Sequence, residues 1–192
     1  MSPRTTTLAL LTALSALTSL SVAAQVGASS DAPHACALLH ADDLAGSGFE
    51  LGAPNGNMLR LTPAQSGAPS AMTVELCFHY TGAARRRSVN VSLETYDSAD
   101  GVAAWLEARN RQAEADSAQV TQHDGSTCER GSYTQQTPNG ERVLHYLACD
   151  RLDGRQRIGL GFESADGADT LPTSADAAQL LAALAKRTGA NH

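Results

Sequence analysis

Residues 72–80, with the sequence MTVELCFHY, carry the pattern that decides the fold class. Apolar and polar side chains alternate along this stretch: Met72, Val74, Leu76, Phe78 and Tyr80 are interleaved with Thr73, Glu75, Cys77 and His79. Because successive side chains of a strand point to opposite faces, the alternation predicts a β-strand with one apolar face. Residues 88–96, SVNVSLETY, repeat the alternation, so the two stretches are predicted to form an antiparallel hairpin.

Three further strands are predicted in the second half of the chain, at residues 126–136, 142–150 and 156–164. They are connected by the turn-forming pairs Asn139-Gly140 and Asp153-Gly154. A shorter strand is predicted at residues 58–61, between loops rich in Gly, Pro, Asn and Ser at 53–57 and 63–71. Most of the predicted strands therefore follow one another through hairpins.

Helices are predicted before, between and after these strands, at residues 98–118 and 174–187 and as short turns within 34–49. In the first helical stretch Ala37, Leu38 and Leu44 are expected to face inward. Helices that border strands joined by hairpins predict an α+β fold, in which a mainly antiparallel sheet is covered by helices. The length of the region, residues 34–188, fits one domain.

The first 24 residues have the features of a secretory signal peptide. An apolar run from Leu8 to Val22 follows Arg4, and the small residues Ala23 and Ala24 follow the run. We expect cleavage after Ala24, a flexible lead-in over residues 25–33, and a bacterial protein that is periplasmic or secreted. The run is too short for a membrane span, so the processed chain is not expected to span a membrane.

Four cysteines, Cys36, Cys77, Cys128 and Cys149, lie in the exported part of the chain. An even number of cysteines in an exported protein predicts two disulfides. A turn at Asn139-Gly140 would place Cys149 opposite residue 130, two positions from Cys128, which favours a Cys128–Cys149 bridge. The pair Cys36–Cys77 then remains.

A metal site is the alternative interpretation of the first two cysteines. His34 and Cys36, and likewise Cys77 and His79, are each separated by one residue, and two thiolates with two imidazoles can bind Zn²⁺ or Cu⁺. The spacing is not a standard one, so the primary prediction contains no metal and no cofactor. Under the alternative, the chain is a metal-handling protein or an enzyme that uses His34 and His79.

Three segments resemble a known family. The stretches CALLHADDLAG, from Cys36, and LCFHYTG, around Cys77, together with the Leu-rich LPTSADAAQLLAALAKR near the end, are similar to small exported bacterial domains of unknown function. Many of these are actinobacterial lipoproteins with a PsbP-like α/β sandwich. The resemblance implies a Cys36–Cys77 bridge and transfers no catalytic residue. This chain lacks a lipid-attachment cysteine and adds Cys128 and Cys149.

Composition and motifs narrow the classes of function. The chain has a formal net charge of −6 and only 4% aromatic residues, so nucleic acid is not an expected partner. We found no nucleophile elbow, zinc-protease helix or phosphate-binding loop, and no catalytic residue is predicted. The sequence therefore favours a non-catalytic domain that binds an envelope protein or a small ligand.

Two surfaces are candidates for that binding. Arg85, Arg86 and Arg87 form a basic cluster that could bind a small anion or an acidic polymer through the guanidinium forks. Gly159 and Gly161 lie on one face of a predicted strand, where missing side chains let a partner approach closely. Either a helix of the same chain packs against the glycines, or, as the alternative, this face forms an exposed groove together with Glu75, His79, Asn90 and Ser92.

Overall fold

The computed structural model describes residues 34–81, 86–115, 118–138 and 140–189. Every described residue belongs to one compact unit, Asp31–His192. The predicted signal peptide and its lead-in, as well as Arg85 and Asn139, lie outside the described residues.

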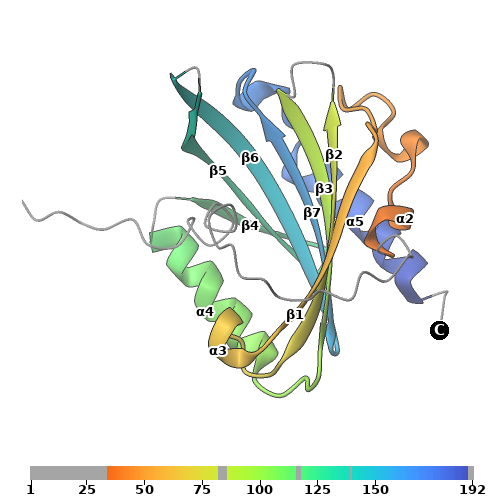
Figure 1. Cartoon of the computed structure of the whole chain (residues 1–192), viewed down its shortest axis with the longest axis vertical. Coiled ribbons are helices and arrows are strands. Elements are labelled where there is room, and N and C mark those ends of the chain that lie inside the picture. The colour runs from red at the N-terminus through yellow and green to blue at the C-terminus, as the bar shows by residue number, and fades with distance from the viewer. Residues whose placement is uncertain (1–33, 82–85, 116–117, 139, 190–192) are drawn as a thin grey trace, which may run out of the picture. The chain divides into compact units, whose positions relative to one another are not determined.

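Seven strands form one antiparallel sheet in the order β1-β2-β3-β7-β6-β5-β4 (Figure 1). The strands are β1 (Pro54–Leu61), β2 (Met72–Thr81), β3 (Arg87–Tyr96), β4 (Gln119–His123), β5 (Ser126–Thr137), β6 (Gly140–Asp153) and β7 (Gln156–Ser164). Four hairpins join neighbours in the sheet: β2–β3, β4–β5, β5–β6 and β6–β7. The predicted α+β class with a mainly antiparallel sheet is confirmed.

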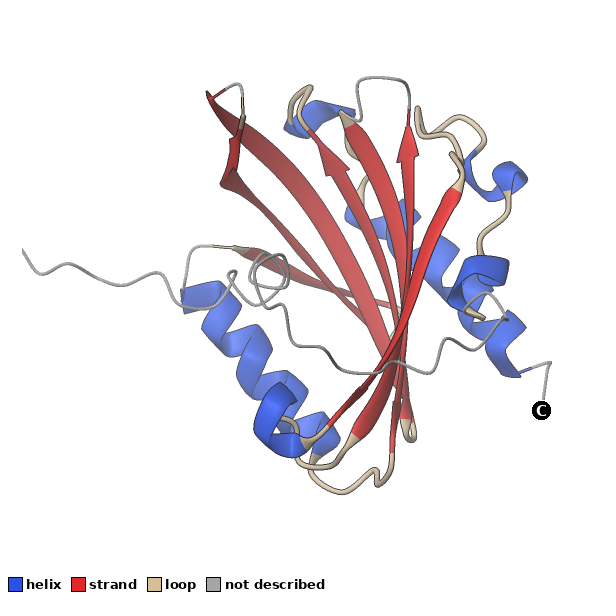
Figure 2. Ribbon diagram, in the orientation of Figure 1, coloured by secondary structure: helices blue, strands red, loops and turns tan. Residues whose placement is uncertain are grey.

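Helices lie on both sides of this sheet (Figure 2). The helical elements are α2 (Ala35–Leu38), η2 (Ala41–Leu44), α3 (Pro63–Ser66), α4 (Val102–Ala115), η3 (Ala168–Thr170) and α5 (Ser174–Gly189). The elements α2, η2 and α5 pack on one face, which we call the covered face, and α3 and α4 pack on part of the other. No helix of the described ranges is long and apolar enough to cross a membrane.

The main core fills the space between the covered face and its helices. Across five neighbouring strands, register places five residues in one row: Cys77, Val91, Leu160, Cys149 and Cys128. Each is at most 1% exposed. Leu181 and Leu184 of α5 close the core from the helix side and are fully buried, as the apolar spacing in the last helix predicts.

A second, smaller core lies where α4 and Ala68, in the loop after α3, pack on the other face. Met72 and Val74 of β2 pack with Val102 and Leu106 of α4. Tyr96 is fully buried among them, and its ring meets the Trp105 ring edge-on, with a centroid distance of 6.3 Å and an interplanar angle of 70°. The two ends of β2 are thus buried on opposite faces.

Both predicted disulfides, Cys36–Cys77 and Cys128–Cys149, are present in the structure. The hairpin register differs slightly from the expectation, because Thr137 pairs with Gly140. This shift brings Cys128 directly opposite Cys149, where the two sulfur atoms can bond without a bulge. The first disulfide ties α2 to the sheet, and the second joins two adjacent strands under α5.

Several predicted boundaries are wrong. The strand expected at residues 58–61 begins at Pro54, since an edge strand tolerates a proline at its first position. The strand β4 was not predicted, because QVTQH is a short polar edge strand without apolar alternation. Ala37 is exposed, and Ala35 instead packs inward with Leu38.

The two disulfides should contribute unequally to stability. The chain-entropy relation predicts that removing Cys36–Cys77, which spans 41 residues, lowers the free energy of unfolding by about 4 kcal/mol. Removing Cys128–Cys149, which spans 21 residues, should cost about 3 kcal/mol. Urea unfolding of the two double Cys→Ala variants measures both values. A larger loss from the shorter loop would show that strand pairing, rather than chain entropy, determines the effect.

Candidate functional site

All four tyrosines of the chain lie on the side of the sheet opposite the covered face. Tyr96 is buried in the small core under α4, and the other three tyrosines lie outside that core. A second row across the sheet connects them: Tyr80, Ser88, Glu163, Tyr146 and Gly131. We call the surface formed by Tyr80, Tyr133, Tyr146, Glu163 and Ala148 the tyrosine face.

Glu163 is the centre of a hydrogen-bond network on the tyrosine face. Ser88 Oγ donates to one carboxylate oxygen at 3.0 Å, and the Tyr133 hydroxyl donates to the other at 2.9 Å. The donors come from β3 and β5, on either side of the β7–β6 pair, so the network links four strands. Both donors are neutral groups, and Glu163 has no ion pair among the described residues.

A second tyrosine–glutamate pair lies beside the first. The Tyr146 hydroxyl donates a hydrogen bond to Glu129 on β5. Gly131 makes this geometry feasible, because a Cβ atom there would lie 2.7 Å from the Tyr146 hydroxyl oxygen. The Tyr133 and Tyr146 rings are 6.2 Å apart between centroids and tilted by 50°. Two aromatic rings are therefore held in fixed positions by two carboxylates.

These contacts change the acidity of the two tyrosines. Burial, together with the negative charge and hydrogen bond of Glu163, raises the pKa of Tyr133 well above its ordinary value of 10.0. Burial and the contact with Glu129 raise the pKa of Tyr146 in the same way. Both hydroxyls thus remain protonated donors over the whole physiological range.

The two predicted glycines lie next to the tyrosine face, in the middle of the sheet. Gly161 pairs with Asn90 and Gly159 pairs with Ser92, as the predicted groove requires. A Cβ atom on Gly161 would lie 2.7 Å from the Asn90 amide nitrogen, so side chains of β3 occupy the space above the glycines. On the next strand Ala148, which pairs with Gly161, is exposed. No helix of the described residues covers this position.

A buried ion network separates the glycines from the part of the sheet under α4. The Arg157 guanidinium donates to Glu94 and to Asp150, each at 2.7 Å. Tyr96 donates a further hydrogen bond to Glu94 at 2.5 Å. Burying such charges is costly unless they are paired, so this network has a structural role at the edge of the open surface.

His79 and Glu75 lie on the covered face, away from the glycines. His79 pairs with Val89, is 3% exposed, and places Nδ1 at 3.0 Å from the carbonyl oxygen of Gly52. Since a carbonyl oxygen only accepts, Nδ1 carries the proton. Glu75 accepts a hydrogen bond from the Ala35 backbone at 3.1 Å, which anchors α2. The structure therefore does not bring these two side chains together with Asn90 and Ser92.

The alternative metal set loses two of its four members in this structure. Cys36 and Cys77 are joined in a disulfide and are not thiolates. Within the described ranges, no group of three or more His, Cys, Asp and Glu side chains is arranged to hold a metal ion. His34 and His79 alone would remain from the predicted set.

The described members of the arginine cluster are held by one carboxylate. Arg86 Nε and Arg87 Nε donate to the two oxygens of Asp166 at 2.6 and 2.9 Å. Arg87 also donates to the carbonyl of Gly48 at 2.9 Å and lies over the Phe49 ring. An external anion at this cluster would have to compete with Asp166.

Comparisons with known proteins do not assign this chain to a family. No protein-family model matches the chain, and no curated protein matches it. Among solved structures, the chain is similar to the extracellular domain of PknH from Mycobacterium tuberculosis, with a TM-score of 0.43 and 12% sequence identity. The alignment covers 81% of this chain and 94% of that chain. The function is therefore inferred from the residues of this chain alone.

The tyrosine–glutamate pairs should make the protein sensitive to alkaline pH. Unfolded tyrosines ionise near pH 10, whereas the folded ones stay protonated, so ionisation favours the unfolded state. The free energy of unfolding should fall as the pH rises above about 10. Chemical unfolding across this pH range measures the decline.

Replacing Tyr133 with Phe tests the assignment. At neutral pH the variant should lose about 1 kcal/mol, the typical contribution of one hydrogen bond. Above pH 10 its stability should decline less steeply than that of the wild type, because the variant lacks one of the tyrosines whose pKa is raised in the folded state. Equal slopes in the two proteins would contradict the role given to Tyr133.

Proposed function

We propose that the protein is an exported, non-catalytic domain that binds a partner protein of the bacterial envelope through the tyrosine face. Export rests on the signal-peptide features of residues 1–24, with cleavage after Ala24, and the site of action is the periplasm or the exterior. The two disulfides support this proposal, since they are typical of proteins from oxidising compartments.

The exposure of Ala148 carries the proposal. This residue lies on β6, with β7 and β5 on either side, yet its side chain is open to solvent. An antiparallel sheet commonly leaves one face open to solvent, and the side chains on such a face are ordinarily polar. Here the open part of the face carries Ala148, Tyr80 and half-buried Tyr133, in addition to polar groups, whereas Tyr146 and the two glycines are buried.

The chemistry of the surface fits a protein interface. Tyrosine is enriched in interfaces because its ring supplies a large contact area and its hydroxyl supplies a hydrogen bond. Fixed side chains lose little conformational entropy on binding, and Tyr133 and Tyr146 are already fixed by Glu163 and Glu129. Tyr80 is 37% exposed and can contact a partner directly.

Charge indicates which partner segment fits. Glu163 and Glu129 receive hydrogen bonds only from hydroxyl groups, so their negative charges have no cationic counterpart among the described residues. A partner that presents Arg or Lys side chains would complement them. Arg donates in a planar fork and stacks on aromatic rings, and thus suits the exposed Tyr80 and the half-buried Tyr133.

A pair of substitutions on β6 tests the proposal. Ala148→Arg places a large cation on the tyrosine face, whereas Val143→Arg places the same side chain on the opposite face, where Val143 is 51% exposed. Both positions tolerate a long polar side chain in the folded protein, so neither variant should lose much stability. Crosslinking in the native envelope, followed by quantitative mass spectrometry, compares the two with the wild type.

We expect the partner crosslinked by the wild type to be retained by Val143→Arg and lost by Ala148→Arg. Thermal unfolding of both variants checks that the loss is not caused by misfolding. Equal recovery of crosslinked partners with all three proteins would exclude the tyrosine face as the binding surface.

A further inference from the structure

The Cys36–Cys77 disulfide lies beside a buried imidazole. Nε2 of His79 is 3.5 Å from the Cys77 sulfur, and Nδ1 donates its proton to the carbonyl oxygen of Gly52. Because Nδ1 carries the proton of the neutral ring, Nε2 presents a lone pair to the sulfur. A disulfide sulfur has no proton to donate, so this lone pair has no donor among the described residues.

The backbone around His79 fixes the direction of its ring. Gly52 lies so close to β2 that a Cβ atom there would collide with the carbonyl oxygen of Tyr80, and this close approach brings the Gly52 carbonyl to Nδ1. His79 is 3% exposed, and the Cys77 beside it is fully buried. The lone pair on Nε2 therefore gains a donor when the disulfide opens and Cys77 becomes a thiol.

The half-cystines of the two disulfides differ in exposure. Cys77 is fully buried, whereas Cys36 is half-buried on α2 and is followed by an exposed residue, Ala37. Cys128 and Cys149 of the other bridge are both at most 1% exposed beneath α5. Exchange between a thiol and a disulfide begins when a thiolate reaches one sulfur atom, so access decides which bridge reacts. Cys36 is the half-cystine that an external thiolate meets first.

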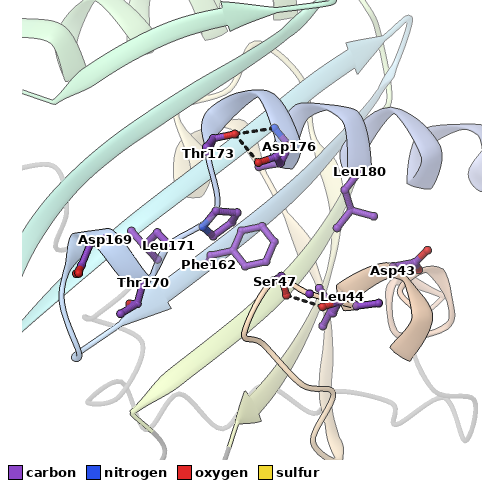
Figure 3. Close-up of a pocket in the computed structure, with 14 residues that line it drawn as sticks. Asp43, Leu44, Ser47, Phe162, Asp169, Thr170, Leu171, Thr173, Asp176 and Leu180 are labelled. Atoms are coloured by element: carbon purple, nitrogen blue, oxygen red, sulfur yellow. Dashed lines mark hydrogen bonds between the residues drawn. The ribbon is translucent and has the colours of Figure 1, made fainter.

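The segment that carries Cys36 has anchors besides the disulfide. Arg187 of α5 binds both carboxylate oxygens of Asp43 in η2, at 2.6 and 2.7 Å. Leu44 of η2 is buried and lines the same cavity as Phe162 of β7 (Figure 3). These contacts keep α2 and η2 beside the sheet when the S–S bond is broken, so the bridge can form again.

We propose that the Cys36–Cys77 bridge is a reversible modification site, reduced by an exported dithiol protein that attacks Cys36, with His79 as the proton acceptor for the Cys77 thiol. The site is separate from the tyrosine face, since Cys77 and His79 belong to the covered face. The proposal does not depend on the partner protein proposed for that face.

The reaction balances in electrons and protons. One thiol of the dithiol loses its proton to water, and its thiolate bonds to the Cys36 sulfur while the S–S bond breaks. The electron pair of that bond stays on Cys77, which takes up one proton and shares it with Nε2 of His79. The second thiolate of the dithiol then attacks the dithiol's own sulfur in the mixed disulfide, and Cys36 leaves and is protonated. The dithiol is oxidised to a disulfide, and two electrons reduce the bridge.

Dithiothreitol is the probe for the dithiol, and the second bridge is the internal control. The native protein is incubated with dithiothreitol, free thiols are blocked with iodoacetamide, and mass spectrometry maps the labels. We expect Cys36 and Cys77 to be labelled while Cys128–Cys149 stays intact. Reduction of both bridges together, reduction of Cys128–Cys149 first, or no reduction without denaturant would each overturn the proposal.

His79→Asn tests the role of the imidazole. The Asn amide can still donate to the Gly52 carbonyl, but it places no acceptor where Nε2 lies. The equilibrium constant for reduction of the bridge by dithiothreitol should fall about fivefold, the effect of losing one hydrogen bond. His145→Asn is the matched control, because it changes a half-buried histidine on β6, three strands away from β2. That variant should keep the wild-type equilibrium.

An unchanged equilibrium in His79→Asn, or an equal fall in His145→Asn, would overturn the role given to His79. The first experiment uses the wild-type protein, so it tests the site even if His79→Asn does not fold.

Discussion

The structure depends on one row of buried residues that crosses five strands: Cys77, Val91, Leu160, Cys149 and Cys128. One disulfide ties this row to α2, and the other closes its far end beneath α5. Because a one-residue slip would turn every side chain of a strand to the opposite face, a row that is buried and covalently tied fixes the register of the five strands that it crosses.

The open surface is the consequence of that constraint. With the odd-numbered residues of β6 and β2 committed to the covered face, the even-numbered ones, including Tyr80, Tyr146 and Ala148, must point the other way. The helix α4 covers only the end of this face near Tyr96. The rest is occupied by tyrosine–glutamate pairs, which hold the side chains in place without a helix above them.

Local patterns were sufficient to predict much of this fold. Alternation in MTVELCFHY predicted β2, the turn at Asn139-Gly140 predicted the bridge between Cys128 and Cys149, and apolar spacing predicted α5. Local patterns could not predict whether His79 and Asn90 share a groove, since the answer depends on the register between β2 and β3. His79 pairs with Val89, so its side chain points to the covered face. Tyr133 and Glu163 were missed because their contact crosses β6, and nothing in the local sequence of either strand indicates it.

The central claim is that the tyrosine face is open in the folded, oxidised protein. A single cysteine introduced in place of Ala148 tests it directly, and a cysteine in place of Val143, exposed on the opposite face of the same strand, is the reference. The measurement is the rate of alkylation of each new thiol under native conditions. The structure predicts similar rates at the two positions. Strong protection of the thiol at position 148, with normal labelling at 143, would show that the face is covered and would contradict the account.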